Sequence, residues 1–223
     1  MKTRFSLLYQ IVRQFTASAV ICTGLVPQAL ADTPRILTIG DSMLVWNFRN
    51  SVPRQLDRLT NAIVTNRAAI GATMLRGEIS RQFLVSDWDI VVVNGGGNDL
   101  LFGCGCISCD ATLNQLVSED LRSGAIVELL TSIRRTVPRV IFVGYLRSPG
   151  VGSLIEHCAD EGNELERRIR EFMDNNDGMD FVSLAGLVPD GDRSFHSFDM
   201  IHPSNHGSRV ISMVILETII TPQ

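Results

Sequence analysis

The sequence predicts an α/β protein: a three-layer α/β/α sandwich in which helices cover both faces of one five-stranded parallel sheet. From residue 35 onward, short apolar runs alternate with longer amphipathic segments, the pattern of βαβ units. The short runs are continuous and rich in β-branched residues, as strands buried on both faces are. No linker or internal repeat divides the chain, so residues 32–223 are expected to form one domain.

The expected strands are 35–39 (RILTI), 62–65 (AIVT), 90–94 (IVVVN), 140–143 (VIFV) and 181–184 (FVSL). Apolar residues at helical spacing predict helices over 52–59, 74–83, 113–136, 153–174 and 204–220, the third of them long or broken. Right-handed crossovers between the strands then place the loops that bind ligands at the carboxyl ends of the strands.

The N-terminal segment has the pattern of a secretory signal peptide. Three basic residues are followed by an uncharged apolar run over residues 15–26, and Ala29 and Ala31 supply the small residues that a signal peptidase reads. We therefore expect residues 1–31 to be removed by cleavage after Ala31, and the mature protein to be periplasmic or secreted.

Two other interpretations of this segment are disfavoured. An uncleaved anchor would need about 20 apolar residues to span a bilayer, and a lipid-modified Cys22 would need a small residue in place of Ile21. The formal charge of the full chain is -4, and removal of three basic residues makes the mature chain more acidic still. No basic stripe is present, so neither nucleic acid nor a stable membrane anchor is expected.

Four short blocks carry the residue types of acyl-transfer chemistry. Gly40-Asp41-Ser42 follows the first expected strand, Gly71 follows the second, and Gly95-Gly96-Gly97-Asn98-Asp99 follows the third. Asp199 stands three residues before His202, just ahead of the last expected helix. Each block alone has a structural alternative as a helix cap or a turn. Together they suggest a serine whose proton an imidazole can accept while a carboxylate holds the other ring nitrogen.

In order, spacing and strand-end placement, these blocks resemble those of the SGNH hydrolases, also called the GDSL family. The resemblance spans residues 40–203, with Met43 where the family name has Leu. It implies a flavodoxin-like fold, with Ser42 as nucleophile, His202 as general base and acid, and Asp199 orienting that histidine. It also implies an oxyanion hole made of the N–H groups of Ser42 and Gly71 and the Asn98 amide.

The activity that this resemblance implies is hydrolysis of carboxylic esters through an acyl-enzyme, without cofactor or metal. The substrate would be a small acyl ester, an acetylated sugar or a lipid ester. Two alternatives remain open: an acyltransferase that uses the same three residues, and a non-catalytic ligand-binding module on the same sheet.

Four cysteines remain after cleavage, namely Cys104, Cys106, Cys109 and Cys158. In an oxidising compartment an even number of cysteines favours two disulfides, although the same four thiols could bind zinc. We expect one bond between the 104–109 loop and Cys158, while the three possible pairings stay open.

Four further polar residues are expected outside the site. His157, His196 and His206 are interpreted as surface or capping residues. Arg147 follows the fourth expected strand and is expected to pair with an acidic side chain of the protein.

Overall fold

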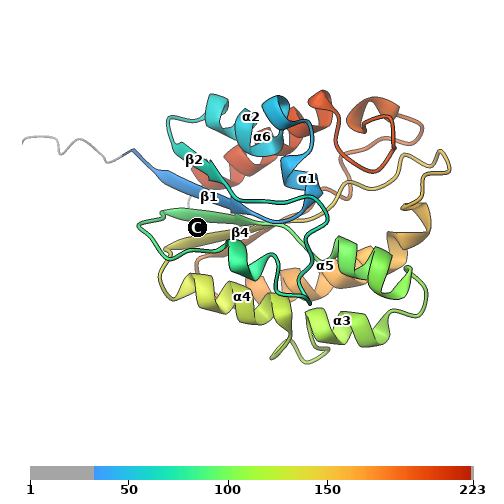
Figure 1. The fold of residues 1–223 in the computed structure, drawn as a ribbon, viewed down its shortest axis with the longest axis horizontal. Helices are drawn as coiled ribbons and strands as arrows, with labels where there is room; N and C mark the ends of the chain where they lie inside the picture. Colours follow the sequence, from blue (N-terminus) through green and yellow to red (C-terminus); the bar gives the residue numbers. More distant parts are fainter. Residues whose placement is uncertain (1–32, 222–223) are drawn as a thin grey trace, which may run out of the picture. The chain divides into compact units, whose positions relative to one another are not determined.

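Five parallel strands form one sheet with the order β2-β1-β3-β4-β5 in the computed structural model, which describes residues 33–221 (Figure 1). The strands are β1 (Arg35–Ile39), β2 (Ile63–Asn66), β3 (Ile90–Val93), β4 (Arg139–Val143) and β5 (Met179–Val182). This is the flavodoxin-like strand order, and its switch point, where a ligand crevice is expected, lies between β1 and β3. The expected signal peptide, residues 1–31, lies outside the described residues.

Helices cover both faces of this sheet, so the predicted three-layer α/β/α sandwich is confirmed (Figure 1). One layer contains α1 (Ser42–Val45), α2 (Val52–Leu59) and α6 (Asn205–Ile220), and the other contains α3 (Asp110–Leu116), α4 (Ala125–Arg134) and α5 (Ala159–Asp174). No helix of the described part is both long and apolar enough to cross a membrane.

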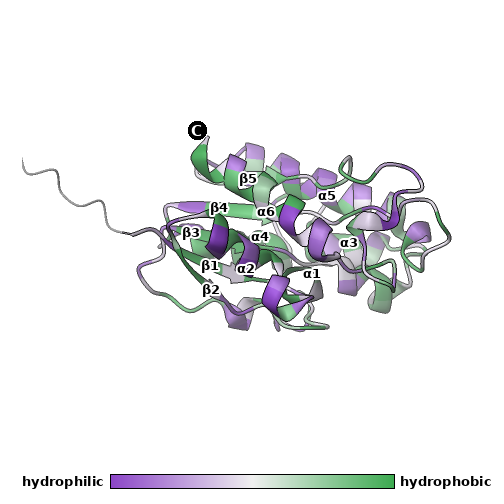
Figure 2. Ribbon diagram, turned by 90° about the horizontal axis from the view of Figure 1, so that it is seen from above, coloured by the Kyte–Doolittle hydropathy of each residue, from purple (hydrophilic) through white to green (hydrophobic). Residues whose placement is uncertain are grey.

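Alternate residues of each strand serve the two layers. Ile36 packs in the apolar cluster of α2 and α6, whereas its neighbour Leu37 packs in the cluster of α4 and α5. Figure 2 shows the consequence: hydrophobic residues fill the sheet, and hydrophilic residues alternate with them along the helices. Burial on both faces explains why the strands are continuous apolar runs in the sequence.

The helix predicted over residues 74–83 is wrong. Turns and the short 3₁₀-helix η2 (Ser80–Gln82) occupy this segment. The carboxylate of Asp99 accepts hydrogen bonds from the N–H groups of Met74 and Leu75, and Gly77 has a φ of 68°. These contacts with a distant residue hold the backbone in turns in spite of its apolar spacing.

Two other helices differ from their predicted bounds. The segment 113–136 is broken into α3 and α4, and the break contains Leu121 at φ 62° and Gly124 at φ 119°. Helix α5 begins at Ala159 rather than near residue 153, after the 3₁₀-helix η4 (Glu156–Cys158). The fifth strand lies two residues earlier than predicted, and the other four strands lie within one residue of their predicted bounds.

Candidate active site

Ser42 is the first residue of α1, directly beyond the carboxyl end of β1. Its neighbour Asp41 caps this helix, since Asp41 Oδ1 accepts a hydrogen bond of 2.9 Å from the Met43 N–H. Gly40 has a φ of 154°, and a Cβ there would lie 2.7 Å from the Asn94 carbonyl oxygen. The glycine therefore lets the chain turn closely past β3 and brings the serine to the sheet edge.

His202 brings its imidazole to this serine from the loop before α6. Its Nε2 lies 2.8 Å from Ser42 Oγ, and its Nδ1 lies 2.7 Å from Asp199 Oδ2. The other oxygen of Asp199 accepts hydrogen bonds of 3.0 Å from the N–H groups of Ile201 and His202. Partial burial by itself raises the pKa of Asp199, but these hydrogen bonds outweigh it and leave the pKa below its usual value.

A tryptophan ring stacks on the imidazole of His202. The rings of Trp46 and His202 lie parallel within 8°, with centroids 3.8 Å apart. The indole N–H of Trp46 donates to Ser197 Oγ at 3.1 Å, and that hydroxyl donates to the Pro203 carbonyl at 2.9 Å. The orientation of the imidazole is thus set by Ser42 at the start of α1, by Trp46 just after the end of α1, and by its own loop.

The two other predicted site residues border the same crevice. Asn98 Nδ2 donates to the Ala72 carbonyl at 2.9 Å, which fixes the amide plane and leaves its second N–H available. Gly71, with a φ of 74°, lies one residue before Ala72, so the Asn98 contact also ties down the loop that follows β2. Asp99 holds the next stretch of that loop through Met74 and Leu75.

Tyr145 is a residue of this site that sequence reasoning missed. Its hydroxyl donates a 2.5 Å hydrogen bond to Asp41 Oδ2 and accepts one of 3.0 Å from the Gly97 N–H. Burial, followed by the charge of Asp41, raises the pKa of Tyr145 well above its usual value. Its position two residues after the end of β4, at the same sheet edge as Ser42, was the one signal that could have indicated it.

A cavity of about 570 Å³ opens beside these residues, within the usual size range for small-molecule sites. Ser42, Gly71, Asn98 and His202 all line it. Away from Ser42, its wall is formed by residues from the end of β4, from α5 and from the loop of residues 104–109, here called the cysteine loop. The apolar residues of that wall include Leu100, Phe142, Leu146, Ile155, Leu165 and Ile169.

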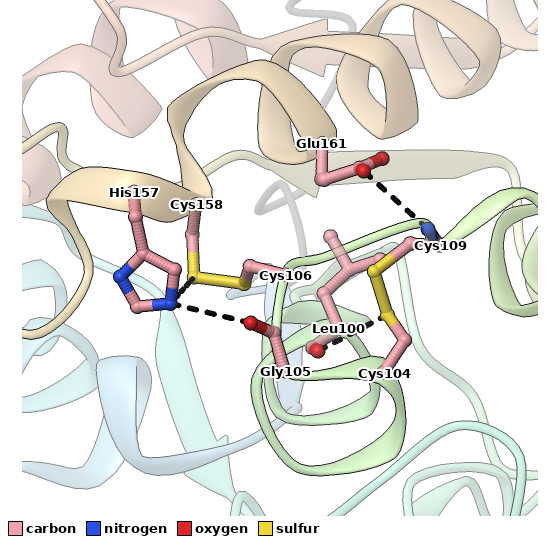
Figure 3. The surroundings of a disulfide bond; sticks show 8 residues. All are labelled: Leu100, Cys104, Gly105, Cys106, Cys109, His157, Cys158 and Glu161. Atoms are coloured by element: carbon pink, nitrogen blue, oxygen red, sulfur yellow. Dashed lines mark hydrogen bonds between the residues drawn. A yellow bond between two sulfur atoms is a disulfide. The ribbon is translucent and has the colours of Figure 1, made fainter.

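The four cysteines form two disulfides in the structure, Cys104–Cys109 and Cys106–Cys158 (Figure 3). The expected link between the loop and Cys158 is therefore present. Both sulfurs of this link belong to residues that line the cavity. The residues that precede these two cysteines are also in contact, because Nε2 of His157 lies 3.2 Å from the Gly105 carbonyl oxygen.

The disulfides also bear on metal binding. Cys106, His157 and Cys158 are the one cluster of three potential ligands among residues 33–221. Its two sulfurs, those of Cys106 and Cys158, are bonded to each other, and a metal would require free thiolates. The zinc alternative therefore has no support in the oxidised protein.

Two polar residues outside the predicted site have different outcomes. Arg147 pairs with Glu166 at 2.8 Å, as expected. The interpretation of His196 as a surface or capping residue is wrong, because its side chain is buried. Its backbone forms an isolated antiparallel β-bridge with Pro203, the residue after His202.

Comparison with known proteins agrees with this architecture. The profile of the GDSL-like Lipase/Acylhydrolase family matches residues 38–210. No curated protein matches the chain. Among solved structures, a lipase from a goat rumen metagenome is 18% identical with a TM-score of 0.60, and 83% of this chain and 97% of that chain are covered.

Two further structures show the same fold. A member of the lipolytic G-D-S-L family from Veillonella parvula is 16% identical with a TM-score of 0.60, over 85% of this chain and 100% of that chain. A carbohydrate acetylesterase family member from Sinorhizobium meliloti is 14% identical with a TM-score of 0.56, over 84% and 97%. The family profile matches most of the chain, so this protein belongs to the GDSL-like lipase/acylhydrolase family and is a carboxylic ester hydrolase of the SGNH type.

Proposed function

We propose that the protein hydrolyses carboxylic esters through an acyl-enzyme on Ser42. His202 takes the proton from Ser42 Oγ as the hydroxyl attacks the ester carbonyl, and then donates it to the leaving alcohol. Asp199 holds His202 in the required tautomer and stabilises the imidazolium. Water, activated by the same imidazole, then attacks the acyl-enzyme and releases the carboxylic acid.

The oxyanion of each tetrahedral intermediate would be bound by the N–H groups of Ser42 and Gly71 and by the Asn98 amide. Ser42 is the first residue of its helix, so its N–H has no partner within that helix. Such fixed donors stabilise charge that develops in the transition state, because they need no reorganisation during the reaction.

One observation carries the proposal. The contact of 2.8 Å between Ser42 Oγ and His202 Nε2 joins residues 160 positions apart in the sequence, and the second nitrogen of the same ring meets a carboxylate. A serine that only capped a helix would need neither contact. The geometry thus supports a reactive serine more strongly than the non-catalytic binding module.

We also propose that the protein acts outside the cytoplasm. Its two disulfides favour an oxidising compartment, and its N-terminal 31 residues have the pattern of a cleaved signal peptide. Mass spectrometry of the exported protein should find a new N-terminus at Asp32. Recovery of the intact N-terminus from the exported fraction would contradict this proposal.

Hydrolysis of p-nitrophenyl acetate by the purified mature protein tests the function. We expect turnover by the wild type, and a loss of about 10⁴-fold or more in kcat for Ser42→Ala and for His202→Ala. Ser86→Ala, a change at an exposed serine, is the matched control and should retain full activity. A folded Ser42→Ala protein with wild-type turnover would overturn the mechanism. If the wild-type protein is folded, has both disulfides and yet does not hydrolyse the ester, this result would point to an acyl acceptor other than water.

A further inference from the structure

A glycine inside helix α5 lies on the wall of the active-site cavity. Gly162 is the fourth residue of this 16-residue helix, and it lines the cavity. Glycine in a helix interior costs about 1 kcal/mol relative to alanine, so its presence calls for a reason. A Cβ added at Gly162 would meet no atom within 4 Å, so the glycine does not serve close packing.

The helix positions around Gly162 identify the space that it leaves open. Ala159, Glu166 and Ile169 also line the cavity, at spacings of three, four and seven residues from Gly162. Residues at these spacings share one helix face, and Gly162 lies within that stripe. A side chain at position 162 would therefore project from the face of α5 that forms the cavity wall.

The polar groups in this part of the cavity are already paired with one another. Arg147 donates to Glu166 Oε1 at 2.8 Å, and to Asn163 Oδ1 at 3.0 and 2.8 Å. It also donates to the Tyr145 carbonyl at 2.9 Å. Beside these groups, α5 presents the apolar side chains of Leu165 and Ile169 to the cavity. Such a surface offers burial rather than hydrogen bonds to a ligand.

The cavity extends from the reacting groups toward α5. His202, which would protonate the leaving alcohol, comes from the loop before α6, whereas Gly162 belongs to the layer on the opposite face of the sheet. The leaving alcohol has to stay within reach of His202 to receive its proton. No such contact limits the acyl group, so the acyl group is the part of the ester that is free to extend toward α5.

We infer that Gly162 is a specificity-determining residue whose missing side chain makes room for the unbranched alkyl chain of a medium-length acyl group. The inference rests on the proposed function and names its substrate class. One further observation fits it: the Cys106–Cys158 disulfide, which also lines the cavity, joins the cysteine loop to the residue just before α5. This bond ties the start of α5, and so the part of the wall that contains Gly162, to the cysteine loop.

The test is the acyl-chain-length profile of p-nitrophenyl esters from acetyl to decanoyl. For the wild type, kcat/KM should rise about fourfold for each methylene that enters the cavity. Gly162→Leu should lower kcat/KM for the octanoyl ester at least tenfold and leave the acetyl ester within about twofold, and Gly162→Ala should fall between. Gly186→Leu adds the same side chain at an exposed turn outside the cavity lining and should reproduce the wild-type profile.

The outcomes separate this inference from the proposed function. A flat wild-type profile, or a Gly162→Leu protein that loses all chain lengths equally, would overturn the inference while ester hydrolysis stands. If the wild type hydrolyses no ester, the proposed function fails, and binding of sodium octanoate then decides the inference alone. Octanoate should raise the Tm of the wild type and of Gly186→Leu but not that of Gly162→Leu, and an equal shift in all three would overturn the inference.

Discussion

The hydroxyl of Tyr145 donates a 2.5 Å hydrogen bond to the buried carboxylate of Asp41, the residue directly before Ser42. The same hydroxyl accepts a hydrogen bond from the Gly97 N–H, next to Asn98. One phenol thus connects the loops that follow β1, β3 and β4. A Cβ on Gly97 would lie 2.7 Å from the Tyr145 ring, so a larger residue there would push these loops apart.

Replacing Tyr145 with Phe should therefore slow the reaction without abolishing it. The change removes a donor to a buried carboxylate and leaves the Gly97 N–H without an acceptor, which should lower the free energy of unfolding by about 1 to 3 kcal/mol. A small displacement of reacting groups can cost up to about a hundredfold in rate, so kcat should fall tenfold or more and KM should change little. Urea unfolding and steady-state kinetics measure the two effects. Unchanged kcat would show that Asp41 positions Ser42 without this hydrogen bond.

The Asn98 amide gives a second prediction, which concerns the chemical step. In the proposed mechanism its free N–H binds the oxyanion, and the loss of one such donor costs about 10²- to 10³-fold in kcat. Asn98→Ala should show this loss with little change in KM. The change also removes the contact with the Ala72 carbonyl. Asn98→Asp, which keeps the size but removes the donors, should be equally slow. If either variant retained more than a third of wild-type kcat, Asn98 would not belong to the oxyanion hole.

Local patterns were sufficient to predict much of this architecture. Each strand is a short buried run, and each candidate site residue follows a strand or precedes a helix, so periodicity and short motifs locate them. The contact between Ser42 and His202 was expected from the resemblance to a family, since nothing local links residues 160 positions apart.

Long-range contacts account for what sequence reasoning missed. Tyr145 lies 104 residues from Asp41, and a tyrosine after a strand has no pattern that names its partner. Likewise, residues 74–83 have helical spacing, but hydrogen bonds to Asp99 from Met74 and Leu75 favour turns. In both cases the deciding group comes from a distant part of the chain, so local propensity gave no indication of it.

The two disulfides should contribute unequally to stability. Cys106–Cys158 joins residues 52 positions apart and Cys104–Cys109 joins residues 5 apart. The loop-entropy relation assigns about 4 kcal/mol to the larger loop and about 2 kcal/mol to the smaller. Urea unfolding of the Cys106→Ser/Cys158→Ser protein should thus show the greater loss, with Cys104→Ser/Cys109→Ser as the matched control. Free thiols in the denatured, unreduced wild type would contradict both pairings.

From the burial of His196 we expect the free energy of unfolding to decrease in mild acid. The side chain is 5% exposed, and neither ring nitrogen has a hydrogen-bond partner among residues 33–221. Burial lowers the pKa of His196, an effect that the charge of Asp199 only partly opposes. As the pH falls below about 6.5, the usual histidine pKa, the unfolded chain binds a proton that the folded protein excludes. The free energy of unfolding should therefore decrease by up to about 1.4 kcal/mol per pH unit until the lowered pKa is reached.

Burial raises the pKa of Asp41 and of Asp99, and a raised carboxyl pKa has the opposite effect, since the folded protein then binds protons more readily than the unfolded chain. The contribution of His196 must accordingly be measured as a difference. His196→Gln removes the titration at this site and keeps a polar group of similar size, so urea unfolding of this variant should vary less between pH 7.5 and pH 5.5 than that of the wild type. His157→Gln, a change at an exposed histidine, is the control and should follow the wild type. Equal pH dependence in all three proteins would mean that His196 binds its proton as readily in the folded protein as in the unfolded chain.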